Sequence, residues 1–517
     1  MTITTAKRPA RALLLTPLAL AAMLVSAECR ADWKFTPTMG LAETYSDNPG
    51  LVPNDQAHGQ FISESIPGFT LSSHSRRLQL NASADWHFYA YQHKDTPNLH
   101  DRERRYAGRA EAIVIEDLLS VVASAEGASR ATSAFGPQFS NLYSSTNRTD
   151  IQTWSIAPIL RHRFGRTANL TVQATRDSVK SNQVTAAYGD SLGNTGAVTL
   201  SSGANFTTFG WDLQYTRQLL DSKHFGSTSS ENANATLRYR LGREWTALAT
   251  VGYDSYEYLA LRDRTAGRSY TAGFSWTPST RTSIEASFGH RYFGKTGSLT
   301  ATSRNRYLVS RVIYSDQVTT NRQQFLLPSA LDTAALLDQL FRNTFPDPVV
   351  RADAVQAYIK ATGLPPSLAN DVNYLSNRYL REKRLQAAYI ITLPHSSLTL
   401  SAYKSERTAL STQQSDSELL GNQFASLNDN VRQRGVDAVF SYRLSARTSA
   451  NASLWAMRST SLTTGIVSPS RAVTLGMTRR FDRKTNGAVE LRHIDTSLNG
   501  GSGYTENALA ATLTVQF

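Results

Sequence analysis

Arginine is the residue type whose abundance and placement suggest chemistry in this chain. The 517 residues include 54 Lys and Arg, 44 of them Arg, against 41 Asp and Glu, which gives a formal net charge of +13. Nine arginines are predicted to lie in strands on the polar face and are candidate pore-lining residues: Arg109, Arg161, Arg176, Arg217, Arg238, Arg240, Arg291, Arg304 and Arg306. Guanidinium groups bind carboxylates and phosphates through paired hydrogen bonds, so a channel lined by them would favour anionic solutes or polymers. Two other roles stay open, because arginines can also meet lipid phosphates at a membrane surface or pair with carboxylates such as Glu111 and Glu490.

Catalytic chemistry is not indicated by the sequence. The chain has no G-x-S-x-G, H-E-x-x-H or P-loop pattern, and its 10 His, including His290 and His493, show no metal-ligand spacing. We therefore predict that the protein is not an enzyme and that it uses no cofactor and no metal.

The first 31 residues have the pattern of a secretory signal peptide. Lys7, Arg8 and Arg11 precede a mostly apolar run, 12–25, and small residues follow at Ser26, Ala27 and Ala31. Cleavage after Ala31 is favoured over cleavage after Ala27, and it would remove Cys29, the only cysteine. A lipid anchor on Cys29 is the weaker alternative, because Glu28 stands where a small residue is usual. Secretion also removes the chain from nucleic acid, despite its basic pI of about 9.7.

Alternating apolar and polar residues recur in runs long enough to cross a membrane as strands. Examples begin at Leu78, Asn232 and Tyr270. No run after residue 31 reaches the roughly 18 apolar residues of a membrane helix. The sequence therefore predicts an all-β fold over 32–517, a transmembrane antiparallel β-barrel in the outer membrane of a Gram-negative cell.

The connections between these runs alternate between short and long. Short turns such as "RFGRT" (163–167) and "RLSART" (443–448) separate longer polar stretches such as 133–149 and 409–430. This asymmetry is typical of outer-membrane barrels, with short turns on the periplasmic side, and it predicts about 18 to 22 strands. A count of 22 requires two weaker strands, near 195–202 and 318–328.

The last ten residues, "ALAATLTVQF", form an alternating strand with one apolar face: Leu509, Ala511, Leu513, Val515 and Phe517. In a closed barrel the last strand pairs with the first, so we expect this face to contact lipid. Phe517 is the predicted assembly signal for the barrel-insertion machinery.

One segment, 329–376, departs from strand periodicity and is predicted to be a helical insertion. Leu336, Leu337, Leu340 and Phe341 form a helical stripe, Asp347-Pro348 opens a second helix, and Gly363 ends it. The strand count places the insertion at the extracellular rim. It would be either a plug in the lumen or an extracellular cap, and its length favours the plug.

Three stretches resemble outer-membrane barrel proteins associated with the PEP-CTERM/exosortase system and its exopolysaccharide gene clusters. They are "DWKFTPTMGLAETYSDNPGL" (32–51), "YRLGREWTALATVGYDSYEY" (239–258) and "GFSWTPSTRTSIEASFGHRYFG" (273–294). The resemblance implies a passage or assembly channel for an exopolysaccharide. The expected partners are outer-membrane lipid, the insertion machinery and an anionic polysaccharide. The alternative is a passive porin or a surface-structural barrel that transports no polymer.

Removing the predicted insertion tests the plug. Joining Leu327 to Arg378 through a short Gly/Ser linker should leave the barrel folded, because loop closure entropy changes only slowly with loop length. If 329–376 is a plug, conductance in planar bilayers should rise. Unchanged conductance through an intact barrel would show that the segment is an extracellular cap.

Overall fold

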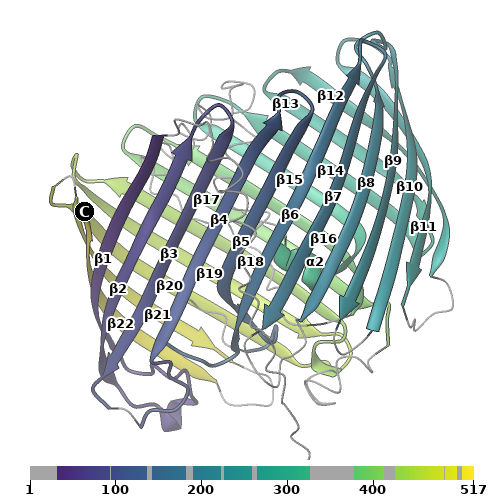
Figure 1. Cartoon of the computed structure of the whole chain (residues 1–517). Coiled ribbons are helices and arrows are strands. Elements are labelled where there is room, and N and C mark those ends of the chain that lie inside the picture. The colour runs from purple at the N-terminus through teal and green to yellow at the C-terminus, as the bar shows by residue number, and fades with distance from the viewer. Residues whose placement is uncertain are drawn as a thin grey trace, which may run out of the picture.

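Within the part of the chain that it describes, the computed structural model contains 22 antiparallel strands in one sheet, which closes into a barrel (Figure 1). The described residues are 32–93, 95–136, 143–181, 190–222, 226–258, 265–326, 376, 378–412, 426–482, 484–497 and 503–517. The strands are β1 (Asp32–Ser46), β2 (Gln60–His74), β3 (Leu78–Tyr91), β4 (Arg102–Ile115), β5 (Leu119–Ala131), β6 (Arg148–Phe164), β7 (Ala168–Ser181), β8 (Ser191–Ser202), β9 (Phe209–Ser222), β10 (Gly226–Arg240), β11 (Trp245–Glu257), β12 (Ala266–Ser279), β13 (Thr282–Arg291), β14 (Gly294–Arg304), β15 (Leu308–Thr320), β16 (Tyr379–Thr392), β17 (Ser396–Ala409), β18 (Val431–Arg443), β19 (Thr448–Ser461), β20 (Val467–Arg480), β21 (Thr485–Thr496) and β22 (Tyr504–Gln516). The predicted all-β barrel is confirmed, at the upper end of the predicted strand number.

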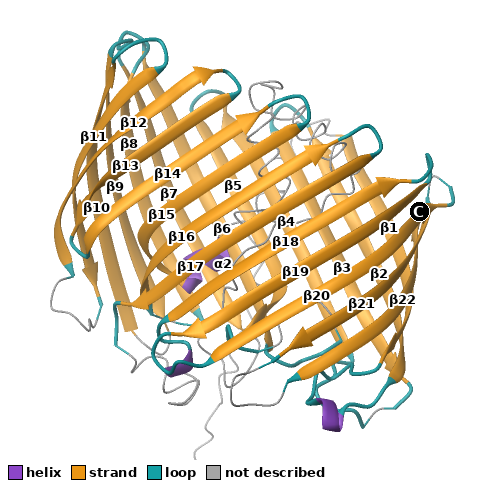
Figure 2. Cartoon of the chain, turned by 180° about the vertical axis from the view of Figure 1, so that it is seen from behind, coloured by secondary structure: helices purple, strands orange, loops and turns teal. Residues whose placement is uncertain are grey.

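The first and last strands close the barrel. Their register runs from Thr38 opposite Gln516 to Ser46 opposite Ala508, and β22 also pairs with β21. Figures 1 and 2 both show β1 and β22 side by side. Closure leaves no strand edge unpaired, which a sheet in lipid requires because the hydrocarbon core offers no hydrogen-bond partners.

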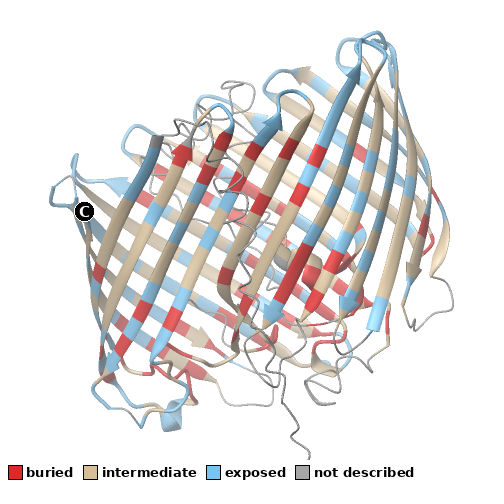
Figure 3. Cartoon of the chain, viewed as in Figure 1, coloured by how far each residue is buried: buried red, intermediate tan, exposed pale blue. Residues whose placement is uncertain are grey.

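Alternation along each strand separates an outward apolar face from a lumen face. In β22, Leu509, Leu513 and the following Phe517 are 48%, 41% and 66% exposed, whereas the side chains of Tyr504 and Glu506 are buried on the other face. Leu237, Val251 and Phe288 continue the outward face on other strands; Figure 3 shows the buried positions spaced along the strands. The terminal strand therefore has the register predicted from its sequence.

The two rims of the barrel differ in loop length. The short turns 165–167, 241–244, 280–281, 393–395, 444–447 and 481–484 all lie at one rim, whereas 47–59, 132–147 and 410–430 connect strands at the other. Gly165 adopts a φ of 57° in the first of these turns, a conformation that suits glycine. Short turns mark the periplasmic rim of such a barrel, so the other rim is extracellular.

Short helices accompany the strands; those with both ends among the described residues are η1 (Asn54–Gln56) in the β1–β2 loop and α2 (Asn321–Leu326) after β15. The strand predicted near 195–202 is confirmed as β8, but the one predicted near 318–328 is wrong. Residues 318–320 end β15, and the chain then turns into α2. No helix among the described residues is long and apolar enough to span a membrane. The predicted signal, 1–31, and the predicted insertion, apart from Ser376, lie outside the described residues.

A charge on the outward face should destabilise the barrel. The substitution Leu513→Lys places an ammonium group against lipid, which costs about 2 to 4 kcal/mol near the bilayer midplane. Thr512→Lys is the matched control, because Thr512 occupies the lumen face of the same strand. Urea unfolding in detergent, followed by the heat-dependent gel shift of the folded barrel, measures both. Equal stability of the two variants would contradict the outward assignment of Leu513.

Candidate functional site

The helix α2 lies inside the barrel, and a cap at its first turn marks where the chain leaves β15. The backbone N–H of Gln323 donates to Thr320 Oγ1, and the backbone N–H of Thr320 donates to Gln323 Oε1, each at 3.1 Å. This reciprocal cap turns the chain from a strand into a helix. Leu326 then packs against Ile151 of β6 and Val179 of β7. Figures 1 and 2 both show α2 within the wall of strands.

Two buried ion pairs attach α2 to different parts of the wall. Arg322 binds Asp177 of β7, and their side chains are 7% and 6% exposed. Gln324 donates to Glu382 Oε2 at 2.9 Å and accepts from Arg407 at 2.8 Å, while Arg407 and Glu382 pair at 3.0 Å. Removing one member of a buried pair leaves an uncompensated charge, so these contacts resist displacement of the helix.

The described parts of the loop between β5 and β6, 132–136 and 143–147, make contacts at the extracellular mouth. Tyr143 donates to Glu506 Oε1 of β22 at 2.8 Å, and Arg492 of β21 donates to the Tyr143 hydroxyl at 2.9 Å and to Glu506 at 3.2 Å. Burial, together with the charge of Glu506, raises the pKa of the Tyr143 hydroxyl, which therefore stays protonated and donates. The loop thus reaches strands that are not neighbours of β5 or β6.

The same loop also contacts a second part of the rim, at the β17–β18 loop. Ser133 Oγ donates to Asn428 Oδ1 at 3.1 Å, in the loop between β17 and β18. Ala134 and Phe135 pack with Val431, the first residue of β18. The β5–β6 loop therefore joins separate arcs of the mouth by polar and apolar contacts.

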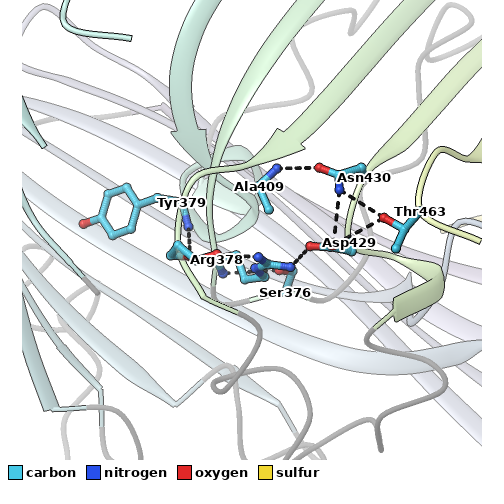
Figure 4. A network of polar contacts seen from close by, with 8 residues as sticks. Ser376, Arg378, Tyr379, Ala409, Asp429, Asn430 and Thr463 are labelled. Atoms are coloured by element: carbon cyan, nitrogen blue, oxygen red, sulfur yellow. Dashed lines mark hydrogen bonds and ion pairs between the residues drawn. The ribbon is translucent and has the colours of Figure 1, made fainter. Parts of the chain in front are cut away.

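A third polar network ties the outer ends of β16 to β20 together (Figure 4). Arg378, 1% exposed in its side chain, binds Asp429. Asp429 also accepts hydrogen bonds from Thr463 Oγ1 at 3.3 Å and Asn430 Nδ2 at 3.2 Å, and Asn430 Oδ1 accepts from the backbone of Ala409 at 3.0 Å. These contacts hold the point at which the chain re-enters the wall after the segment that follows α2.

Four tyrosines gather at the extracellular rim, where β13 and β14 are short; this tyrosine cluster consists of Tyr256, Tyr258, Tyr292 and Tyr379. The rings of Tyr258 and Tyr379 stack with centroids 4.5 Å apart, and the hydroxyls of Tyr258 and Tyr292 lie 3.3 Å apart. Tyr379 of β16 also reaches Thr228 of β10, with its hydroxyl 3.3 Å from Thr228 Oγ1.

A pocket of about 190 Å³ lies beside this cluster, and we call it the lumen pocket. Tyr256 and Tyr379 line it together with Val318, Glu231 and neutral polar residues of the wall and α2, among them Thr195, Thr216, Asn232 and Gln323. Ring faces next to hydroxyl and amide groups suit a ligand with apolar C–H surfaces and many hydroxyls.

Six of the predicted pore-lining arginines lie on the lumen face: Arg109, Arg161, Arg238, Arg240, Arg291 and Arg304. Arg291 and Arg238 have carboxylate partners among the described residues. Arg291 binds the fully buried Asp254 at 2.9 and 2.7 Å, and Arg238 lies 3.8 Å from Asp212.

The other three predicted arginines lie elsewhere. Arg176 and Arg217 face outward, because the residues that follow them, Asp177 and Gln218, face the lumen and contact α2. The prediction that Arg176 and Arg217 face the lumen was therefore wrong, because a shift of one residue along a strand reverses the face. Arg306 is in the β14–β15 turn, with its guanidinium 5.1 Å from the ring centre of Tyr307.

Sequence reasoning missed the arginines that organise the mouth. Arg322 could have been found, because the Thr320 to Gln323 spacing is a capping signal that places Arg322 in the first turn of a helix. Arg378 and Arg407 carry no comparable local signal. Their partners are 51 and 25 residues away in sequence.

The closed barrel, its apolar outward face and its asymmetric rims define an outer-membrane β-barrel protein. Among the described residues, no group of three or more His, Cys, Asp or Glu is arranged to hold a metal ion.

No family model and no curated protein matches the chain. Its fold is similar to that of the siderophore receptor PirA from Pseudomonas aeruginosa, with 10% identity, a TM-score of 0.45, and 94% of this chain and 80% of that chain covered. It is also similar to the FrpB iron transporter from Neisseria meningitidis (10% identity, TM-score 0.49, 93% and 82% covered). The outer membrane protein OpdK from Pseudomonas aeruginosa matches with 10% identity and a TM-score of 0.36 over 94% of this chain and 99% of that chain. No ligand or activity is carried over from these proteins.

Breaking the Arg322–Asp177 pair should release α2. Arg322→Met leaves Asp177 buried without a counter-charge, which costs about 3 to 5 kcal/mol. Hydrogen–deuterium exchange of the peptide containing 321–326 should therefore accelerate. Arg76→Met is the control, since the Arg76–Glu116 pair is exposed at the periplasmic rim and should contribute less than about 1 kcal/mol. Unchanged exchange in the Arg322 variant would show that the pair does not hold the helix.

Proposed function

We propose that this barrel is a passage across the outer membrane for an acidic extracellular polysaccharide, in PEP-CTERM/exosortase-linked exopolysaccharide production, and that its extracellular mouth is gated. The observation that carries the proposal is the lumen pocket beside the tyrosine cluster. The resemblance of three stretches of the sequence to barrels of that system supports the same substrate class.

The pocket suits a sugar unit for two chemical reasons. The ring faces of Tyr256 and Tyr379 can pack against the C–H face of a pyranose, which is apolar although the sugar is hydroxyl-rich. Thr195, Thr216 and Asn232 supply neutral donors and acceptors around it. Neutral groups bind hydroxyls without the desolvation cost of a bare charge, so a chain can bind and still move on.

The lumen arginines favour a polymer with acidic groups. Arg161 and Arg240 lie near the periplasmic rim, where Arg161 donates to Ser120 Oγ at 3.1 Å and Arg240 to the Gly242 carbonyl at 3.0 Å. These partners are neutral, so the guanidinium charges remain available to carboxylates on a passing chain. A polymer that enters from the periplasm would meet them before it reaches the lumen pocket.

Passage requires the mouth to open. The β5–β6 loop, held by Tyr143 and Glu506, and the helix α2, held by Arg322 and Asp177, both occupy the path to the extracellular side. Each is attached by buried polar contacts to strands that are themselves fixed in the sheet. The gate can therefore move while the wall of the barrel stays intact.

A gene deletion with complementation tests the proposal. Cells without the gene should retain acidic polysaccharide in the periplasm, and the wild-type gene should restore it to the cell surface. The double variant Tyr256→Ala/Tyr379→Ala should restore export poorly, because these two rings line the lumen pocket. Loss of an aromatic contact costs about 0.5 to 1.5 kcal/mol per ring pair, a change of roughly twofold to tenfold in binding.

The matched control removes two tyrosines from the outward face of the same strands, in the double variant Tyr253→Ala/Tyr389→Ala, which are 51% and 40% exposed. Export should be normal in this strain, provided that both variants show the heat-dependent gel shift of a folded barrel. Normal surface polysaccharide in the deletion strain, with reduced uptake of small solutes, would overturn the proposal in favour of a passive porin.

A further inference from the structure

On the outward face of strands β16 to β19, apolar residues give way to cationic residues toward the extracellular rim. On the apolar side of this boundary stand Ala387, Ala402, Val436 and Ala456, which are opposite one another in register. On the other side Lys404, Arg434 and Arg458 are exposed and directly opposite one another in register. We call these three residues the cation row. The strands that carry it lie side by side in Figure 2.

The cation row lacks an acidic partner within the described residues. Neighbouring outward cations do have one: Arg432 binds Glu406 at 2.9 Å, and Arg471 binds Asp495 at 2.6 Å. Like charges directly opposite each other on a sheet repel, so three such positions in succession destabilise the bare wall. An external anion that bridges the row would remove this repulsion.

A shallow apolar groove of about 450 Å³ continues from the row toward the membrane centre. Ala387, Ala402 and Ala456 form its floor, because their small side chains leave room between the larger Leu385 and Val436, and Lys404, Arg434 and Arg458 also line it. The surface therefore combines space for an acyl chain with three cations at the level of a head group.

We propose that this surface binds the phosphorylated glycolipid of the outer leaflet, the lipopolysaccharide, with its phosphates on the cation row and an acyl chain in the groove. Phosphate oxygens accept charge-assisted hydrogen bonds from guanidinium and ammonium groups, and Arg does so through two parallel bonds. The row lies on the extracellular side of the barrel, so the lipid it meets is that of the outer leaflet. Basic pockets beside apolar surface are the usual means of recognising anionic lipid head groups.

The outward face of β7 to β10, on another side of the barrel, differs from the cation row in the pairing of its charges. Arg217 of β9 faces outward there, but it pairs with Glu231 of β10 at 3.2 Å. Arg176 of β7 is opposite Asn194 of β8, so these described strands carry no row of cations opposite one another as β17 to β19 do.

Native mass spectrometry of the full-length protein in detergent tests the proposal, with diphosphorylated and monophosphorylated lipid A and phosphatidylglycerol as probes. The wild-type protein should retain diphosphorylated lipid A most strongly. The triple variant Lys404→Gln/Arg434→Gln/Arg458→Gln should lose affinity for it by roughly tenfold or more, because charge-assisted bonds to phosphate are the stronger kind. Ala402→Phe should weaken binding without changing any charge, since it fills the groove.

The matched control is Arg176→Gln/Lys180→Gln/Arg217→Gln, which removes three outward positive charges from β7 and β9 and should bind lipid A as the wild type does; Lys180 is exposed on the same face of β7 as Arg176. All variants must show the heat-dependent gel shift of a folded barrel. Equal binding by the cation-row variant, or equal loss in the β7 and β9 control, would overturn the proposed site. Stronger retention of phosphatidylglycerol than of lipid A would overturn the assignment to the outer-leaflet glycolipid.

Discussion

Every backbone amide and carbonyl of a sheet in lipid must find its partner within the protein, and the rest of this structure depends on that constraint. The pairing of β1 with β22 satisfies it by closing the sheet. Closure fixes which side chains face lipid and which face the lumen, because alternate residues point to opposite faces. The lumen face does not contact lipid, so charged and aromatic side chains can occupy it.

The lumen uses its charges mainly to hold the segments that cross it. Arg322 with Asp177, Arg407 with Glu382, and Arg492 with Glu506 are all buried pairs that involve α2, strands next to it, or the β5–β6 loop. Such pairs contribute little net stability compared with apolar packing, but they are costly to break singly. They therefore specify where α2 and the loop lie. The basic composition therefore overstates the positive charge of the pore, because buried carboxylates neutralise part of the charge that suggested anion selectivity.

The wall of the barrel could be predicted from the sequence, whereas the arrangement inside it could not. Period-two alternation and short turns are local signals, so strands such as β10 and β22 were predicted with the right faces. Residues 321–326 were expected to belong to a weaker strand near 318–328, which the strand count required, but the chain forms α2 there and Leu326 packs on Ile151 and Val179. Arg176 and Arg217 failed by one residue, since a single shift in register reverses the face. Contacts such as Tyr143 with Glu506, 363 residues apart, leave no local trace.

Strands β16 and β17 carry the anchor of α2 on one face and exposed cations on the other. On the lumen side, Glu382 and Arg407 bind Gln324 of α2. On the outward side, Lys383 adjoins Glu382 in sequence, and Lys404 is three residues from Arg407 on the same strand. The anchor of α2 and the outward cations therefore occupy the same short stretch of these two strands, on opposite faces of the wall.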